Sequence, residues 1–343
     1  MNPISHRQEA KNQRALDQLP ADLKKQLRKS EQPAWVPPML ATLTEERFSR
    51  QGWLFEEKFD GVRCIVFRHG SELNLYSRNR KRLDQRYPEL VEALLNQAPT
   101  NFIADGEIVA FKSNVSSFEM LQQRMQVDHP SAQLIRRVPV RLCLFDLIYL
   151  HQYDLRHLPL GGRKQLLRSA FQFRNPLRFT RHRDTEGEAY YQDACRRGWE
   201  GVIAKNADSL YLAGRSRDWL KFKCVKEQEF VIVGYTDPEG QRIGFGALLV
   251  GFYRANNLIY AGKVGTGYDT DTLKRLGIQL SRLQTRISPV TSTGLPRSGV
   301  HWVKPKLVAQ IRFTEWTRDD KLRHPRFVGL RDDKTPDDVV RED

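Results

Sequence analysis

Short runs rich in apolar residues, separated by turn residues, mark most of the first two thirds of this chain. This pattern is typical of β-strands. It predicts strands at residues 53–58, 64–69, 72–76, 102–110, 140–150, 201–205 and 218–224. Helical stretches are expected between them, at residues 88–97, 117–126, 160–171 and 185–198. Short strands mixed with helices in this way indicate an α+β domain.

The pattern changes after residue 227. Closely spaced apolar runs at residues 230–235, 247–254 and 258–264, with Gly, Asp and Pro between them, predict a small all-β barrel. An OB-type fold suits the length and a nucleic-acid contact, and an SH3-like barrel fits the number of strands equally well.

A chain of 343 residues exceeds the usual size of one hydrophobic core, so two domains are expected. The expected division is an N-terminal extension at 1–33, an α+β domain at 34–226, a barrel at 227–336 and a tail at 337–343. Residues 6–29 are polar with scattered leucines and predict a loose amphipathic helix or a frayed extension.

Charge points to a polyanionic partner. The chain has 56 Lys and Arg against 41 Asp and Glu, a net charge of +15, which favours nucleic acid through counterion release. A basic surface that binds nothing is the alternative. No apolar run is long enough to span a bilayer, so no membrane partner is expected. Residues 1–33 lack the apolar core of a secretory signal, so a cytoplasmic protein is expected.

The four cysteines are far apart in sequence and form no C-x-x-C pair. This spacing argues against a zinc site and gives no reason to expect disulfides. Cys64, Cys143, Cys195 and Cys224 are therefore expected to be reduced and buried.

The first candidate active-site segment is residues 56–63, where a predicted strand ends with Lys58 before an Asp-Gly turn. No G-x-x-x-x-G-K-[ST] motif occurs, so a nucleoside triphosphate would be bound without a P-loop. A lysine at a strand end is by itself usually a solvated charge. Four further blocks on predicted strands accompany it, at residues 105–109, 144–147, 200–205 and 219–223.

These five blocks, in this order, resemble the nucleotidyltransferase motifs of the ATP-dependent DNA ligases and their mRNA-capping relatives. The resemblance covers about residues 35–336, because residues 331–334 resemble the final R-x-D-K motif of the ligases. It implies an adenylation domain of antiparallel sheets and helices followed by an OB-fold domain. The bacterial ligases of the end-joining type are similar to this chain at residues 38–41, 211–223 and 262–267. We expect a stand-alone minimal ligase.

The resemblance implies Lys58 as the nucleophile that becomes covalently bound to AMP. Its ordinary pKa of about 10.4 keeps an amine protonated, and nearby Lys221 and Lys223 are expected to lower that pKa. They lie two residues apart and so on one strand face, where they would also neutralise the triphosphate. A solvated basic strand face is the alternative.

Other nucleotide contacts follow from the same resemblance. Glu56 would read adenine, Arg63 would contact the ribose, Arg78 would hold the substrate phosphate and Phe145 would stack on adenine. Surface ion pairs, and plain core packing for Phe145, are the alternatives. For Arg78, the basic residues at 80–82 leave the register open by one or two positions.

Glu107 and Glu200 are the expected Mg²⁺ ligands, since carboxylate oxygens suit this ion. Glu107 is also expected near the ribose, and Asp105 on the same strand face is a candidate supporting acid. Arg331, Asp333 and Lys334 would orient the pyrophosphate of ATP. Residues 318–321 share the R-x-D-K pattern, and we prefer the later copy because it comes last, after Pro-Arg-Phe.

The expected activity is sealing of nicked double-stranded DNA with 5′-phosphate and 3′-hydroxyl ends, in DNA repair, with ATP and Mg²⁺ as cofactors. We expect a monomer and consider a Ku-like end-binding protein as a partner. The alternatives are an RNA ligase, a capping-type nucleotidyltransferase, or a non-catalytic repair scaffold that binds nucleic acid.

Overall fold

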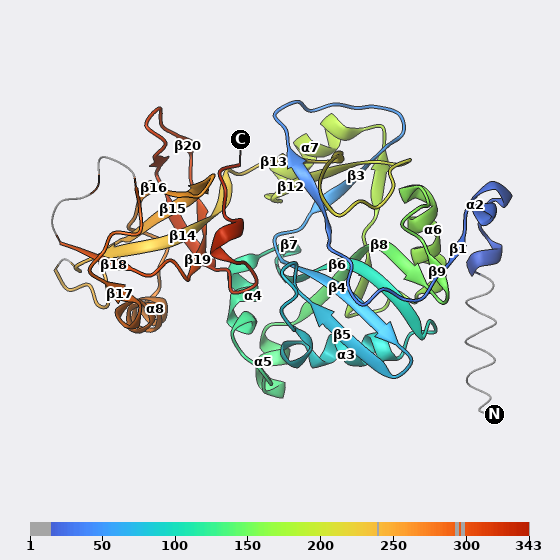
Figure 1. Cartoon of the computed structure of the whole chain (residues 1–343), viewed down its shortest axis with the longest axis horizontal. Coiled ribbons are helices and arrows are strands. Elements are labelled where there is room, and N and C mark those ends of the chain that lie inside the picture. Colours follow the sequence, from blue (N-terminus) through green and yellow to red (C-terminus); the bar gives the residue numbers. More distant parts are fainter. Residues whose placement is uncertain (1–14, 239, 292–294, 296–298, 343) are drawn as a thin grey trace. The chain divides into compact units, whose positions relative to one another are not determined.

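The computed structural model describes residues 15–238, 240–291, 295 and 299–342. The chain divides into two compact units, Met1–Cys224 (unit 1) and Val225–Asp343 (unit 2) (Figure 1). Within the described ranges, none of the helices has the length and apolar composition needed to cross a membrane.

Unit 1 contains two β-sheets. The larger sheet has the order β1 (Arg28–Lys29), β9 (Tyr153–Asp154), β8 (Val140–Leu150), β6 (Asn101–Lys112), β4 (Val62–His69) and β5 (Glu72–Tyr76), with β10 (Leu177–Phe179) and β7 (Val115–Ser116) at its margins. The smaller sheet has the order β11 (His182–Asp184), β3 (Trp53–Lys58), β12 (Gly201–Asn206), β13 (Gly214–Lys223) and β2 (Met39–Leu43). Pairing is antiparallel except for β10 with β8 and β13 with β2.

Helices lie against both sheets of unit 1 (Figure 1). They are α2 (Ala21–Lys25), α3 (Pro88–Leu95), α4 (Phe118–Met125), α5 (Ala132–Arg137), α6 (Leu160–Ala170) and α7 (Gly187–Arg196), with the 3-10 helix η1 (Asp84–Arg86). Ser117 caps α4 by accepting a hydrogen bond from the Met120 N–H, and Pro88 begins α3 where no backbone donor is needed.

The apolar faces of the two sheets share one core. Ile65 and Ile103 from the larger sheet pack in the same cluster as Met39, Leu54 and Trp219 from the smaller sheet. Phe145, one of the nucleotide-binding candidates, belongs to this cluster.

From residue 15 onward, the N-terminal extension packs on the rest of unit 1. Leu16 and Leu19 are buried, the Gln165 side chain donates to the Gln18 carbonyl at 2.9 Å, and β1 pairs with β9. The part of the expected helix before residue 15 lies outside the described residues.

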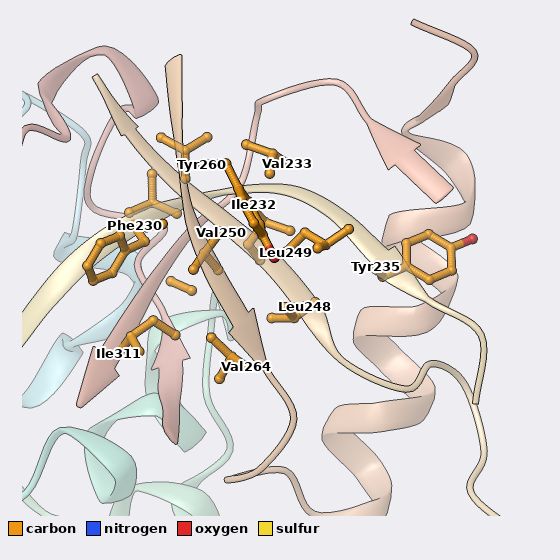
Figure 2. Close-up of a cluster of buried hydrophobic side chains, with 14 of the residues drawn as sticks. Phe230, Ile232, Val233, Tyr235, Leu248, Leu249, Val250, Tyr260, Val264 and Ile311 are labelled. Carbon is orange, nitrogen blue, oxygen red and sulfur yellow. The ribbon is translucent and has the colours of Figure 1, made fainter. Parts of the chain in front are cut away.

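Unit 2 is a curved sheet with one long helix. Its strands are β14 (Glu227–Thr236), β15 (Leu248–Arg254), β16 (Asn257–Val264), β17 (Gln284–Thr285), β18 (Val300–Val303), β19 (Val308–Arg312) and β22 (Arg326–Leu330), and β20 (Glu315–Trp316) pairs with β21 (Leu322–Arg323). β14 pairs with β15, β18 and β19, so the sheet bends around it as in an OB-type barrel. Figure 2 shows apolar side chains such as Ile232, Val250 and Ile311 gathered in its core.

Helix α8 (Thr270–Arg282) was not anticipated from the sequence. Asp269 caps it by accepting a hydrogen bond from Thr272, and Leu276 and Leu280 pack into the barrel core. The 3-10 helix η2 (Pro336–Asp338) leads into the C-terminal tail, where Val339 is buried and accepts a hydrogen bond from Tyr253.

The expectation that all four cysteines are reduced was wrong. Cys195 near the end of α7 and Cys224 after β13 form a disulfide, whereas Cys64 and Cys143 are free and buried. Sequence spacing gave no sign of this pair, because only the packing of α7 beside the end of β13 brings the two sulfurs together.

Candidate active site

Three adjacent strands of the smaller sheet carry the lysines of the candidate site. Gly201 on β12 lies opposite both Lys58 on β3 and Lys223 on β13. Two residues further along β12, Ile203 lies opposite both Glu56 and Lys221. Because side chains alternate between the two faces of a sheet, all of these positions share one face.

Gly201 has no side chain at the centre of this arrangement. Its φ is +154°, and a Cβ built there would lie 2.0 Å from the carbonyl oxygen of Phe222. Only glycine therefore fits between Lys58 and Lys223 with this backbone, because any Cβ would collide with the backbone of β13.

Lys58 is paired with Glu200, a residue just before β12. Burial by itself lowers the pKa of Lys58, but the Glu200 carboxylate, with Asp60 and Glu107 nearby, raises that pKa above its ordinary value. The expectation that Lys221 and Lys223 lower the pKa of Lys58 was wrong for the free chain, because the carboxylates dominate its surroundings.

The larger sheet contributes Arg63 and Glu107, which lie opposite each other on β4 and β6. The Arg63 guanidinium donates to both carboxylate oxygens of Asp105 at 2.6 Å and to the Met39 carbonyl at 3.0 Å. The Tyr211 hydroxyl donates to the same Asp105 carboxylate at 2.6 Å. Asp105 thus fixes the orientation of Arg63.

Two cations lie over the ring of Phe145. The Arg63 guanidinium carbon is 4.6 Å from its ring centroid, and the Lys205 Nζ is 4.1 Å from it. The Phe145 side chain is 7% exposed and contacts the edge of Trp219. Phe145 is therefore part of the core and also borders the candidate site.

Glu56 is buried and paired with two lysines that the sequence analysis did not single out. Lys164 on α6 forms an ion pair with it, and the Lys205 Nζ lies 2.6 Å from its other oxygen. Burial lowers the pKa of Lys205 to about 8, although Glu56 opposes that shift. Strand alternation could have placed Lys205 on the face of Glu56, whereas nothing in the sequence connects Lys164 with it.

Arg78 lies in a tight turn after β5. Ser77 N–H donates to the Lys81 carbonyl, and Arg80 N–H donates to the Ser77 carbonyl. Arg80 stacks on Trp35, and Arg82 pairs with Asp84 at 2.6 Å. No hydrogen bond or ion pair of the Arg78 side chain occurs within the part of the chain that the structure describes. Arg80 and Arg82 contact other side chains of the protein, so Arg78 is the arginine of residues 78–82 that is available to bind a ligand.

Both R-x-D-K segments lie in unit 2. Residues 318–321 form the turn between β20 and β21, where Asp320 has a φ of +56° and binds Arg254 at 2.8 Å. In the later copy, Arg331 donates to both oxygens of Asp333 at 2.9 and 2.8 Å, and Lys334 lies 3.1 Å from Glu229.

Taken together, the sheet face that carries Lys58, Lys221 and Lys223, the Glu200 carboxylate beside Lys58 and the OB-type domain later in the chain are the features of a nucleotidyltransferase. Residues 38–223 match the family model "ATP dependent DNA ligase domain", and residues 241–334 match "ATP dependent DNA ligase C terminal region". The chain therefore belongs to the ATP-dependent DNA ligase family.

Individual relatives agree with this family. The chain is 35% identical over 322 residues to the multifunctional non-homologous end joining protein LigD of Pseudomonas aeruginosa, which covers 92% of this chain and 37% of that protein. It is 37% identical over 315 residues to LigD of Mycobacterium tuberculosis, with 90% and 40% covered. A solved structure, mycobacterial DNA ligase D complexed with ATP and MES, superposes with a TM-score of 0.63 at 34% identity, covering 89% of this chain and 98% of that one.

The chain spans about two fifths of the length of these LigD proteins. The expected fold class, an adenylation domain followed by an OB-type domain, and the expected end-joining type of ligase are confirmed.

Proposed function

We propose that this chain seals nicks in double-stranded DNA through a lysyl-AMP intermediate on Lys58. The observation that carries the proposal is the face shared by Lys58, Lys221 and Lys223, with Glu200 against the nucleophile. A partly buried lysine with charges of both signs around it is suited to covalent transfer of a nucleotide, because its protonation can be changed by what binds beside it.

The side chains around this face would hold ATP. Phe145 and Glu56 would contact adenine, Arg63 and Glu107 the ribose, and Lys221 and Lys223 the phosphates. Arg331, Asp333 and Lys334 of unit 2 would orient the departing pyrophosphate, and Arg78 would bind a phosphate of the DNA. Phosphoryl transfer depends mainly on in-line positioning and charge neutralisation, which explains the density of cations.

Glu107 and Glu200 fit a magnesium ion. No cluster of three or more metal-binding side chains occurs among the residues that the structure describes. Mg²⁺ commonly binds one or two carboxylates, with waters and substrate phosphates completing its shell, and both carboxylates lie close enough to Lys58 to raise its pKa. When bound, the ion would supply neutralisation of phosphate charge.

Lys58 must lose a proton before it attacks. In the free chain its ammonium is held by Glu200, which keeps the pKa of Lys58 raised. A cation that binds the Glu200 carboxylate removes this stabilisation, so binding of such a cation and deprotonation of Lys58 are linked.

Three displacements then follow. The Lys58 Nζ attacks the α-phosphorus of ATP and releases pyrophosphate. An oxygen of the 5′-phosphate at a nick attacks lysyl-AMP, which frees Lys58 and forms a phosphoanhydride with AMP. The 3′-hydroxyl then attacks the 5′-phosphorus, loses its proton and releases AMP as the new phosphodiester forms.

The test uses ATP labelled at the α-phosphate with Mg²⁺. Acid-stable label is expected on the wild-type chain and absent from Lys58→Ala, and a singly nicked duplex should discharge the label as it is sealed. Label from GTP but not ATP would indicate a capping-type enzyme. No label from either would refute the proposal in favour of a non-catalytic scaffold.

We further propose that the chain acts as a cytoplasmic monomer in end-joining repair, with a Ku-like end-binding protein as partner. The resemblance to proteins named for non-homologous end joining supports this setting. The expected result is that a Ku-like protein increases joining of double-strand breaks but not sealing of nicks. Equal effects on both substrates would contradict recruitment to ends.

A further inference from the structure

The carboxylate of Glu229 on β14 is shared by two cations of the 331–334 segment. Its Oε1 lies 3.1 Å from the Lys334 Nζ and 3.8 Å from the Arg331 Nη1. The strand register places Glu229 opposite Gln310 on β19, and the Gln310 side chain accepts from Arg331 at 3.3 Å. Two adjacent strands of the barrel thus present acceptors to this segment.

The two cations differ in how they are held. Arg331 is 8% exposed and donates twice to Asp333, and its backbone N–H donates to the Val308 carbonyl at 2.7 Å. Its guanidinium is therefore fixed by its own segment and by β19. The Lys334 side chain is 13% exposed, and Glu229 lies within ion-pair distance of the ammonium at the end of its four-carbon stem.

We infer that Glu229 is a positioning residue, which restricts the orientation of the Lys334 ammonium within unit 2 before the triphosphate binds. The inference rests on the proposed function, in which Lys334 contacts ATP during lysyl-AMP formation. An ammonium has three N–H donors, so one ammonium can bind a carboxylate and a phosphate oxygen at the same time. Ordering the side chain before ATP arrives removes an entropic cost from binding.

The test separates the first chemical step from the last. Glu229→Gln keeps the shape and an acceptor but removes the charge that holds Lys334. Lysyl-AMP formation is measured against ATP concentration, and sealing of a pre-adenylylated nick is measured without ATP. The expected result is a KM for ATP raised about five- to tenfold, equivalent to about 1–1.4 kcal/mol, with unchanged sealing of the pre-adenylylated nick.

A matched control lies two residues away on the same strand. Glu227 pairs with Arg312 at 3.0 Å. Glu227→Gln also removes a charge from β14 but leaves both ion pairs of Glu229 in place, and it should leave the KM for ATP unchanged. In a Lys334→Met background, Glu229→Gln should add no further effect, because its target is already gone.

Three results would overturn the inference. An unchanged KM in Glu229→Gln would show that Lys334 needs no anchor, and a lower KM would show that Glu229 competes with ATP. Equal loss in both steps would show that Glu229 only stabilises the barrel. A wild-type chain that forms no lysyl-AMP would instead refute the proposed function, so the two failures are distinguishable.

Discussion

Glu57 is a buried carboxylate on the far side of β3 from Lys58. Its side chain is 7% exposed, its Oε1 has no hydrogen-bond partner among the described residues, and its Oε2 lies 3.4 Å from an exposed Arg178 guanidinium. Burial raises the pKa of Glu57 to about 7, only partly opposed by Arg178 and Arg197. We predict that Glu57→Gln stabilises the protein at alkaline pH.

The sign follows from proton linkage. The pKa of Glu57 is higher in the folded chain than its ordinary 4.5, so the folded state binds more protons between these values. Its contribution to stability is therefore present at acidic pH and lost as the pH rises through about 7. One pKa unit corresponds to about 1.4 kcal/mol, so the loss by pH 8 is about 3 kcal/mol. An amide carries no charge and avoids this loss.

The assay is urea unfolding of wild type and Glu57→Gln at several values between pH 5 and pH 8.5. The stability gain should grow with pH and approach about 3 kcal/mol at the alkaline end. Glu45→Gln, at a side chain that is 79% exposed, is the control and should show no such trend. A Glu57→Gln difference that is constant with pH, or a variant less stable at pH 8, would refute the reasoning.

Three further predictions follow from the structure. Arg163→Met leaves the fully buried Asp146 without its cation, and urea unfolding should show a loss of about 3–5 kcal/mol. Gly201→Ala places a Cβ against the Phe222 carbonyl, and it should cost about 1–3 kcal/mol and slow lysyl-AMP formation measured with labelled ATP. Titrations should show nicked DNA binding at least about tenfold more weakly in 200 mM than in 50 mM salt.

The sequence by itself determined many of the strands and the chemical type of the site. Strands β3 and β8 have the bounds that their runs of residues between turn signals predicted, residues 53–58 and 140–150. Strand alternation places Glu56 with Lys58, and Lys221 with Lys223, on one face. These features depend on near neighbours in the chain, so the local pattern suffices to predict them.

Only the tertiary structure decided which distant residues meet. Strand register aligns Lys58 with Gly201 and Lys223, and packing of α6 brings Lys164 to Glu56. The raised pKa of Lys58 follows from its contact with Glu200, which no local pattern encodes. Contacts between segments far apart in the chain depend on strand register, burial and the exclusion of water. These are properties of the folded core, and no short stretch of sequence determines them.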